Sequence, residues 1–332
     1  MRGEETRGEI LEQPALMRRA LSILSVPARY AAEALASREF VYSIGVGPTL
    51  HPASLLGRIL GKVGGPGAIE MDAEDFSNWL AERPKRPAAV IFSETGEERE
   101  ALLAIRELRK RDPAAPVISV LGSPGSTLHR ASDYGLVFTR RPGRMGLFSP
   151  MSVAGLLLAA EVARLAGMPA RAHSLRSLLE AAPEQAAEAL GRAESVADEA
   201  AELIARSRLL FVVSTNGMKP AAQEFSYRLT MMSGIMCDVA SPGEFLATKH
   251  RLLSAGTPVL VLEPERSPEV KMAAERYGAI VIGVGPAGPH VPLGVNPPGE
   301  IAPLVYAPAL LLLALKVTLI LGIDPDASVR VM

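Results

Sequence analysis

The sequence predicts an α/β protein built from two doubly wound halves, each with a parallel sheet covered by helices. Short, continuously apolar runs alternate with helical patterns along most of the chain. Such runs are typical of strands that are buried on both faces, as in parallel sheets. The order of these elements also occurs twice, so the main strands of the first half have counterparts in the second.

The predicted strands of the two halves can be paired in order. Those of the first half begin at Phe40, Ala88 and Pro116, and their counterparts begin at Leu209, Thr257 and Gly278. A helical pattern follows the small-residue loops, which indicates strand–helix–strand units. We therefore place a first domain at residues 37–170 and a second at 171–332. Residues 1–36 form a helical extension, within which Pro27 is expected to end the first helix.

Composition limits the classes of function. The 332 residues are 48% hydrophobic, which is enough for sizeable cores, and the net charge of −1 gives no electrostatic ground for binding nucleic acid or an anionic membrane. The single cysteine, Cys237, and five scattered histidines predict neither a disulfide framework nor a metal site, and no cofactor is expected. The charged start of the chain lacks an apolar signal region, so a cytoplasmic protein is expected.

One apolar segment, residues 303–322, is about long enough to cross a membrane. Pro308 and Lys316 lie inside it, however, and an all-apolar helix is equally typical of a buried core or a dimer interface. We therefore expect a buried helix, no membrane insertion and a homodimer.

The segment from Ser93 to Glu98 (Ser-Glu-Thr-Gly-Glu-Glu) predicts an anion-binding loop. It follows a short apolar strand and comes directly before a helical pattern. The first N–H groups of a helix lack partners, and the helix dipole favours negative charge there. Ser93, Thr95 and Gly96 are therefore candidate phosphate ligands. The acidic residues of the loop fit equally well a capped helix start, and they repel a dianion unless they point away.

Two other strand ends carry candidate ligands, because ligands of open α/β sheets lie at the carboxyl ends of the strands. Gly47 and Thr49 belong to Gly-Val-Gly-Pro-Thr, which is an incomplete dinucleotide fingerprint and fits a tight turn as well. Ser214 belongs to Ser-Thr-Asn-Gly, which either caps a helix or holds a ligand.

Groups able to transfer protons follow in the second half. Glu224 and Arg228 lie four residues apart on a predicted helix, which fits either a surface ion pair or a catalytic role. Lys249 and His250 lie in a predicted loop after Glu244. There they are either simply solvated or able to move a proton, as a histidine does when it opens a sugar ring.

Taken together, these motifs resemble the two-domain members of the sugar isomerase (SIS) family. Those members are the isomerase half of glucosamine-6-phosphate synthase and the amino-sugar-phosphate deaminases. Glu9–Pro14 looks like the family's E-I-x-E-Q-P, Gly45–Thr49 stands at its G-C-G-T-S, and Ser93–Glu98 stands at its phosphate loop, S-Q-S-G-E-T. Gly122–Leu128 and Gly322–Asp326 also match. The resemblance covers nearly the whole chain and implies two domains with five-stranded parallel sheets.

The resemblance implies a sugar-phosphate ligand and an isomerase or deaminase that usually forms a dimer. Ser93, Thr95 and Gly96 then hold the phosphate. The loop residues Glu94 and Glu98 replace the family's glutamine and threonine. The remaining residues implied to contact the ligand are Gly47, Thr49, Ser214 and Arg228.

The family's catalytic residues are not matched position by position. Met231 stands at the base glutamate of the family, while Glu224 matches an earlier glutamate. The ring-opening histidine falls on His250 only after a three-residue slip. Glu224 or Glu244 is then the expected base, with His250 opening the ring.

Two alternatives stay open. The chain could be a non-catalytic sugar-phosphate sensor or interaction protein, since the C-terminal lysine of the family is replaced at best by Arg330. Alternatively, the ligand carries no phosphate, and Glu94 and Glu98 accept hydrogen bonds from its hydroxyl or amine groups.

Overall fold

The computed structural model describes residues 2–79, 86–138, 143, 145–215 and 217–327. The chain divides into two compact units, one of Ala15–Pro183 and one of Met1–Pro14 with Glu184–Met332. We call them the first and the second unit. Each division falls at a proline inside a helix, Pro14 in α1 (Glu4–Ala36) and Pro183 in α7 (Pro169–Val196). The domain boundaries at residues 36 and 170 remain predictions.

The predicted end of the first helix at Pro27 is wrong, because α1 continues without a break from Glu4 to Ala36. Leu24 and Ala28, on either side of this proline, are 1% and 0% exposed. Packing of this face keeps the segment helical, although a proline removes one backbone hydrogen bond.

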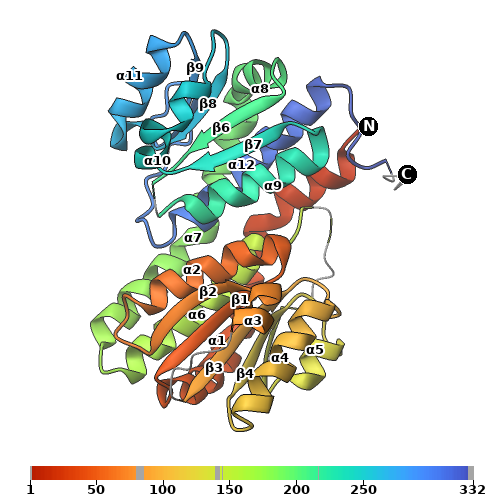
Figure 1. Ribbon diagram of the computed structural model, residues 1–332, viewed down its shortest axis with the longest axis vertical. Helices are drawn as coiled ribbons and strands as arrows, with labels where there is room; N and C mark the ends of the chain where they lie inside the picture. Colours follow the sequence, from red (N-terminus) through yellow and green to blue (C-terminus); the bar gives the residue numbers. More distant parts are fainter. Residues whose placement is uncertain (1, 80–85, 139–142, 144, 216, 328–332) are drawn as a thin grey trace. The chain divides into compact units, whose positions relative to one another are not determined.

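The first unit contains a five-stranded, fully parallel sheet in the order β2-β1-β3-β4-β5 (Figure 1). Its strands are β1 (Phe40–Gly45), β2 (Gly67–Asp72), β3 (Pro87–Ser93), β4 (Val117–Leu121) and β5 (Tyr134–Val137). Its helices are η1 (Gly47–Thr49), α2 (Leu50–Leu60), α3 (Ala73–Trp79), α4 (Arg99–Arg111), α5 (Thr127–Ala131) and α6 (Phe148–Leu165). Side chains of β1, β3, α3 and α4 form one core cluster, and α2 packs against α6.

The second unit repeats this topology in the order β10-β9-β8-β6-β7, again fully parallel. Its strands are β6 (Leu209–Val213), β7 (Met236–Ala240), β8 (Pro258–Leu262), β9 (Ile280–Gly285) and β10 (Val291–Pro292). Its helices are α8 (Asp198–Ala205), α9 (Lys219–Ser233), α10 (Pro242–Ala247), η2 (Lys249–Leu252), η3 (Pro264–Arg266), α11 (Pro268–Arg276) and α12 (Ala302–Ile320). The predicted α/β class, with two parallel five-stranded sheets flanked by helices, is therefore confirmed.

Two helices, α6 and α12, are long and apolar enough to cross a membrane, but 89% and 83% of their apolar windows are buried within the protein. A core helix passes the same test of length and composition. Within the second unit, α12 packs against α8 and α9, and Lys316 Nζ donates to Glu194 O at 2.8 Å and Asp198 Oδ1 at 2.6 Å. The one charged side chain of this helix is thus anchored at its surface.

The start of α1 is capped by the far end of the chain. Asp326 accepts hydrogen bonds from Glu5 N at 2.8 Å, from Thr6 N at 3.0 Å and from the Thr6 hydroxyl at 2.6 Å. Asp324 accepts one from Gly3 N at 3.0 Å. These carboxylates satisfy N–H groups that have no partner within the helix and complement its dipole.

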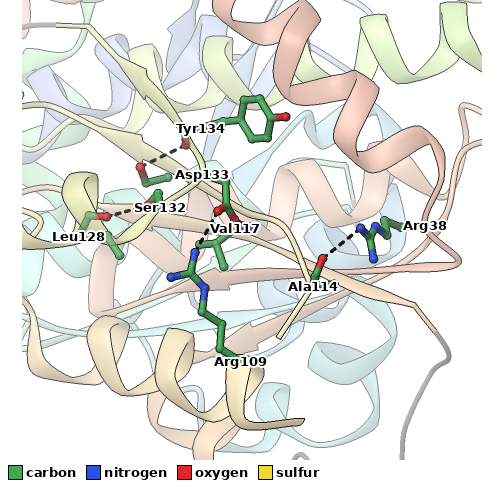
Figure 2. A network of polar contacts seen from close by, with 9 residues as sticks. Arg38, Arg109, Ala114, Val117, Leu128, Ser132, Asp133 and Tyr134 are labelled. Atoms are coloured by element: carbon green, nitrogen blue, oxygen red, sulfur yellow. Dashed lines mark hydrogen bonds and ion pairs between the residues drawn. The ribbon is translucent and has the colours of Figure 1, made fainter. Parts of the chain in front are cut away.

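A network of hydrogen bonds joins residues at the amino ends of β4 and β5 in the first unit (Figure 2). Asp133 accepts hydrogen bonds from Val117 N at 2.8 Å and from Arg109 Nη2 at 3.1 Å, while Arg38 Nη2 donates to Ala114 O at 3.1 Å. A cavity of about 420 Å³ is lined in part by Arg38 and Asp133. Because ligands of such sheets bind at the opposite, carboxyl edge, we assign this network to anchoring the sheet.

Candidate functional site

The strand order places a candidate crevice at one point of the first sheet. The order reverses between β1 and β3, and the chain leaves these neighbouring strands in opposite directions. Ligands of open α/β sheets bind at such switch points, outside the carboxyl ends of the strands. The loops that follow β1 and β3 are Gly45–Thr49 and Ser93–Glu98, the two segments that the sequence singled out.

In the loop after β3, the donors of the predicted phosphate site are bound to the carboxylate of Glu98. The Ser93 hydroxyl donates to Glu98 Oε2. Glu98 Oε1 accepts from the Thr95 hydroxyl at 2.9 Å and from Thr95 N at 3.3 Å. In this structure the donors of the loop therefore hold a carboxylate of the protein itself, and binding of a phosphate by the loop remains a prediction.

Gly96 gives this loop its tight shape. Its φ of +76° is left-handed, its N–H donates to Ser93 Oγ at 2.6 Å, and a Cβ here would lie 2.1 Å from Ser126 Oγ. Only glycine tolerates both the backbone angle and the close approach.

The other two glutamates of the loop are turned to other partners. Glu94 Oε1 accepts from Leu147 N, the N-cap of α6, at 3.3 Å. Glu97 Oε1 accepts from Thr127 N at 2.9 Å, and hydrogen bonds from the Thr127 side chain and backbone lower the pKa of Glu97. Glu98 is thus the one glutamate of the three whose described hydrogen bonds come from both Ser93 and Thr95.

Thr49 joins the two loops at the switch point. Its hydroxyl donates to Phe92 O at 2.8 Å and accepts from Val46 N at 2.8 Å, and the residue is only 3% exposed. Gly47 has a φ of +54°, with open space where a Cβ would be. Thr49 therefore holds the loop after β1 against the end of β3, while Gly47 leaves open space beside this loop.

Ser149 is a residue near this loop that was not predicted from the sequence. This residue lies in the first turn of α6, two residues after Leu147, and is 0% exposed. Its hydroxyl has no hydrogen-bond partner within the part of the chain that the structure describes. A buried, unpartnered hydroxyl is unfavourable. The signal available in the sequence was a pair of hydroxyls, Ser149 and Ser152, at the start of an otherwise apolar helix.

The corresponding switch point of the second sheet lies between β6 and β8. Ser214, after β6, is 3% exposed, and its hydroxyl has no partner among the described residues. Glu263, after β8, is 3% exposed and has a φ of +53°. Burial raises the pKa of Glu263, although Arg266, whose Nε lies 2.9 Å from Glu263 Oε2, acts in the opposite direction. Asn216 of the predicted Ser214 motif lies outside the described residues.

Glu224 and Arg228 form a buried ion pair on α9, not the surface pair that their spacing also allowed. Arg228 Nε donates to Glu224 Oε1 at 2.7 Å, and the side chains are 5% and 1% exposed. The guanidinium of Arg228 also lies 5.1 Å from the centre of the Tyr227 ring.

In the second unit, Lys249 connects Glu244 with His250: it is the residue before His250 and its side chain contacts Glu244. Lys249 Nζ donates to both carboxylate oxygens of Asp238 at 2.6 Å and lies 3.4 Å from Glu244 Oε1. The hydrogen bond to Asp238 raises the pKa of Lys249. His250 Nδ1 lies 3.2 Å from Phe245 O. When Nδ1 donates this bond, the neutral ring keeps Nε2 as an acceptor.

The structure therefore gathers one set of predicted residues at the switch point of the first unit and places a second set in the second unit. The first set is Gly47, Thr49, Ser93, Glu94, Thr95, Gly96 and Glu98. The second set is Ser214, Glu224, Arg228, Glu244 and His250. Their roles remain predictions. No metal-binding group of three or more His, Cys, Asp or Glu is found among the described residues. Burial raises the pKa of Cys237 to about 11, so its thiol is unreactive.

Comparison with known proteins agrees with this architecture. The chain is 29% identical, over 97% of its length, to glutamine–fructose-6-phosphate aminotransferase (isomerizing) of Aeropyrum pernix, but the match covers only 53% of that relative. The chain thus spans about half the length of the curated relatives it matches. No family model matches the chain.

Solved structures of the same fold cover nearly the whole chain. The C-terminal domain of glucosamine-fructose-6-phosphate aminotransferase from Francisella tularensis has a TM-score of 0.84 at 19% identity, over 95% of this chain and 96% of that one. Glucosamine-6-phosphate deaminase from Thermotoga maritima has a TM-score of 0.75 at 22% identity, over 96% of this chain and 95% of that one. The resemblance to two-domain sugar isomerase proteins, predicted from the motifs, is confirmed.

Proposed function

We propose that the chain binds a phosphorylated sugar or amino sugar and catalyses its isomerisation or deamination. The observation that carries the proposal is the loop after β3, whose hydroxyls and backbone N–H hold a carboxylate at the switch point of the first sheet. Similarity along nearly the whole chain to relatives named as isomerising fructose-6-phosphate aminotransferases supports it. So does the fold shared with a glucosamine-6-phosphate deaminase.

In this proposal the phosphate of the ligand takes the place of the Glu98 carboxylate. Ser93 and Thr95 donate their hydroxyl hydrogens to it, and the Gly96 turn keeps the backbone close. Glu94 holds the start of α6 against the loop. Thr49 and Gly47 are proposed to line the ligand site of the first unit, and Ser214 and Arg228 stay candidate ligand residues of the second unit.

The proposed chemistry is a proton shuttle. His250 moves a proton from the anomeric hydroxyl to the ring oxygen and so opens the sugar. A carboxylate then takes the proton from C2 and returns it to C1. Glu244 is the better placed of the two candidates by chemistry, because its side chain is 52% exposed, whereas Glu224 is committed to the buried pair with Arg228.

The protein is further proposed to work in the cytoplasm as a homodimer, without a cofactor, nucleic acid or membrane. The two domains proposed for it are residues 37–170 and 171–332, after the extension at 1–36. A non-catalytic sugar-phosphate sensor is the other possibility that the sequence raised. The names of the relatives, which include isomerases, favour an enzyme.

Incubation in D₂O with fructose 6-phosphate, tagatose 6-phosphate or glucosamine 6-phosphate tests this proposal. An enzyme incorporates deuterium at C1 or C2, which proton NMR detects even without net conversion. We expect His250→Gln to slow exchange with the closed-ring sugars, while Glu97→Gln, in the same loop as the phosphate ligands, leaves it unchanged. Binding by wild type without any deuterium incorporation would instead identify a sensor.

A further inference from the structure

We propose that Glu98 determines the ligand specificity of the loop after β3: its carboxylate is an internal anion that competes with the phosphate of the ligand. This inference rests on the proposed function, since it assumes that the crevice takes a sugar phosphate. It adds that displacing Glu98 from the loop costs affinity, so that wild-type protein binds phosphate compounds more weakly than a variant without this carboxylate.

The hydrogen-bond donors of the loop are already in use. Ser93 has a single hydroxyl hydrogen, and it is donated to Glu98 Oε2. The Thr95 hydroxyl and Thr95 N both donate to Glu98 Oε1, at 2.9 and 3.3 Å. Carboxylate and phosphate oxygens accept such bonds in the same way. The two anions therefore need the same three hydrogens.

The charge of Glu98, like its use of the hydrogen-bond donors, disfavours phosphate binding. A phosphate placed beside the ionised Glu98 is repelled, and the repulsion is stronger in a partly buried loop than in water. Glu98 is half-buried and forms the N-cap of α4 with an extended backbone (φ −64°, ψ 125°). Rotation of its side chain toward solvent can therefore free the loop without unwinding the helix.

A second observation concerns the start of α6, which is hydrogen-bonded to the same loop. The hydroxyl of Ser149 is fully buried at the start of α6, whose N-cap Leu147 contacts Glu94 of the same loop. It has no hydrogen-bond partner in the described part of the chain. An acceptor oxygen that reaches the start of α6 would satisfy this hydroxyl.

Glu97 provides a matched control, because it is an acidic residue of the same loop with a different partner. Its carboxylate accepts from Thr127 N at 2.9 Å, while Glu98 faces Ser93 and Thr95. Glu97→Gln and Glu98→Gln change the net charge equally and keep the side-chain size. Any difference between them therefore reports on the position of the carboxylate, and not on the charge of the whole protein.

The experiment uses calorimetry at one ionic strength to measure the binding of fructose 6-phosphate, inorganic phosphate and fructose. The proteins compared are wild type, Glu98→Gln, Glu97→Gln and Glu98→Ser. We expect Glu98→Gln to bind fructose 6-phosphate and inorganic phosphate about tenfold more tightly than wild type. Fructose binding should not change, and Glu97→Gln should match wild type. Glu98→Ser, which removes the competing side chain altogether, should gain at least as much.

The possible outcomes separate this inference from the proposed function. Equal, measurable affinity of wild type and Glu98→Gln for fructose 6-phosphate overturns the role of Glu98 and leaves the proposed function standing. An equal gain in Glu97→Gln overturns it as well, because the effect is then one of net charge. If wild type and all three variants bind neither phosphate compound, the proposed function fails and this inference fails with it. Circular dichroism confirms that each variant is folded.

Discussion

The carboxyl ends of the two sheets have the same strand topology but differ in how their polar side chains are paired. At the first, the hydroxyls of Ser93 and Thr95 are bound to Glu98, so an anion sits among matched donors. At the second, the Ser214 hydroxyl is buried without a partner in the described part of the chain, and the buried Glu263 adopts a positive φ of +53°. The two units thus share the strand order, while the polar groups at their switch points differ.

The largest effect is expected at the ion pair of α9, the helix that follows β6. The equivalent helix α2, after β1, contains no acidic residue. Arg228→Met removes the cation that is paired with the buried Glu224 carboxylate, and should lower the free energy of unfolding of the second unit by about 3–5 kcal/mol. Urea unfolding followed by circular dichroism measures this loss. The double variant Glu224→Gln/Arg228→Met should recover most of it; no recovery would show that the two side chains are not coupled.

A smaller loss of stability is expected when a hydroxyl at the carboxyl end of the first sheet is removed. Ser93→Ala removes the acceptor of Gly96 N and one donor to Glu98, and should cost the first unit about 2 kcal/mol. The same urea titration measures it, together with weaker binding of fructose 6-phosphate. An unchanged unfolding midpoint would mean that the loop is not held by the Ser93 hydroxyl.

At the carboxyl end of the second sheet, Glu263→Gln should stabilise the protein by about 1 kcal/mol at pH 7. Because burial raises the pKa of Glu263 above its ordinary 4.5, the folded state holds this proton more tightly than the unfolded state. The stability that proton binding to Glu263 contributes is therefore fully present below pH 4.5. It is lost as the pH rises through the folded-state pKa of Glu263. The gain of the variant over wild type should grow between pH 4.5 and 7 in thermal unfolding. A gain that is independent of pH would contradict this cause.

The smallest effect is expected for Ser214→Ala, which removes a buried hydroxyl that makes no described hydrogen bond. Unfolding should shift by less than about 0.5 kcal/mol, in contrast to the loss in Ser93→Ala. A destabilisation similar to that of Ser93→Ala would remove the difference between the two sheet ends. If the melting temperatures of wild type and Ser214→Ala diverge only when a sugar phosphate is present, Ser214 is a ligand residue.

Most of the fold could be predicted from the sequence, because strands buried on both faces leave continuous apolar runs such as Ala88–Phe92. The loop composition also singled out the segment after β3; that it binds an external anion remains a prediction, and in this structure its donors hold the Glu98 carboxylate. The sequence could not show which anion occupies it, since that depends on the side-chain rotamer of Glu98. Nor could the spacing of Glu224 and Arg228 show that the pair is buried, because buried and exposed pairs on a helix share the same i, i+4 pattern.

The carboxylates that cap α1 have a consequence for synthesis of the chain on the ribosome. Asp326 lies 321 residues beyond Glu5, so the first turn of α1 lacks these caps until the ribosome has made the chain through Asp326. The unit that contains both ends can therefore close only after translation has passed Asp326, whereas Ala15–Pro183 is available for folding much earlier. Premature termination before Ile323 would leave the first turn of α1 without its capping carboxylates, and a frayed segment of this kind is a preferred site of proteolysis.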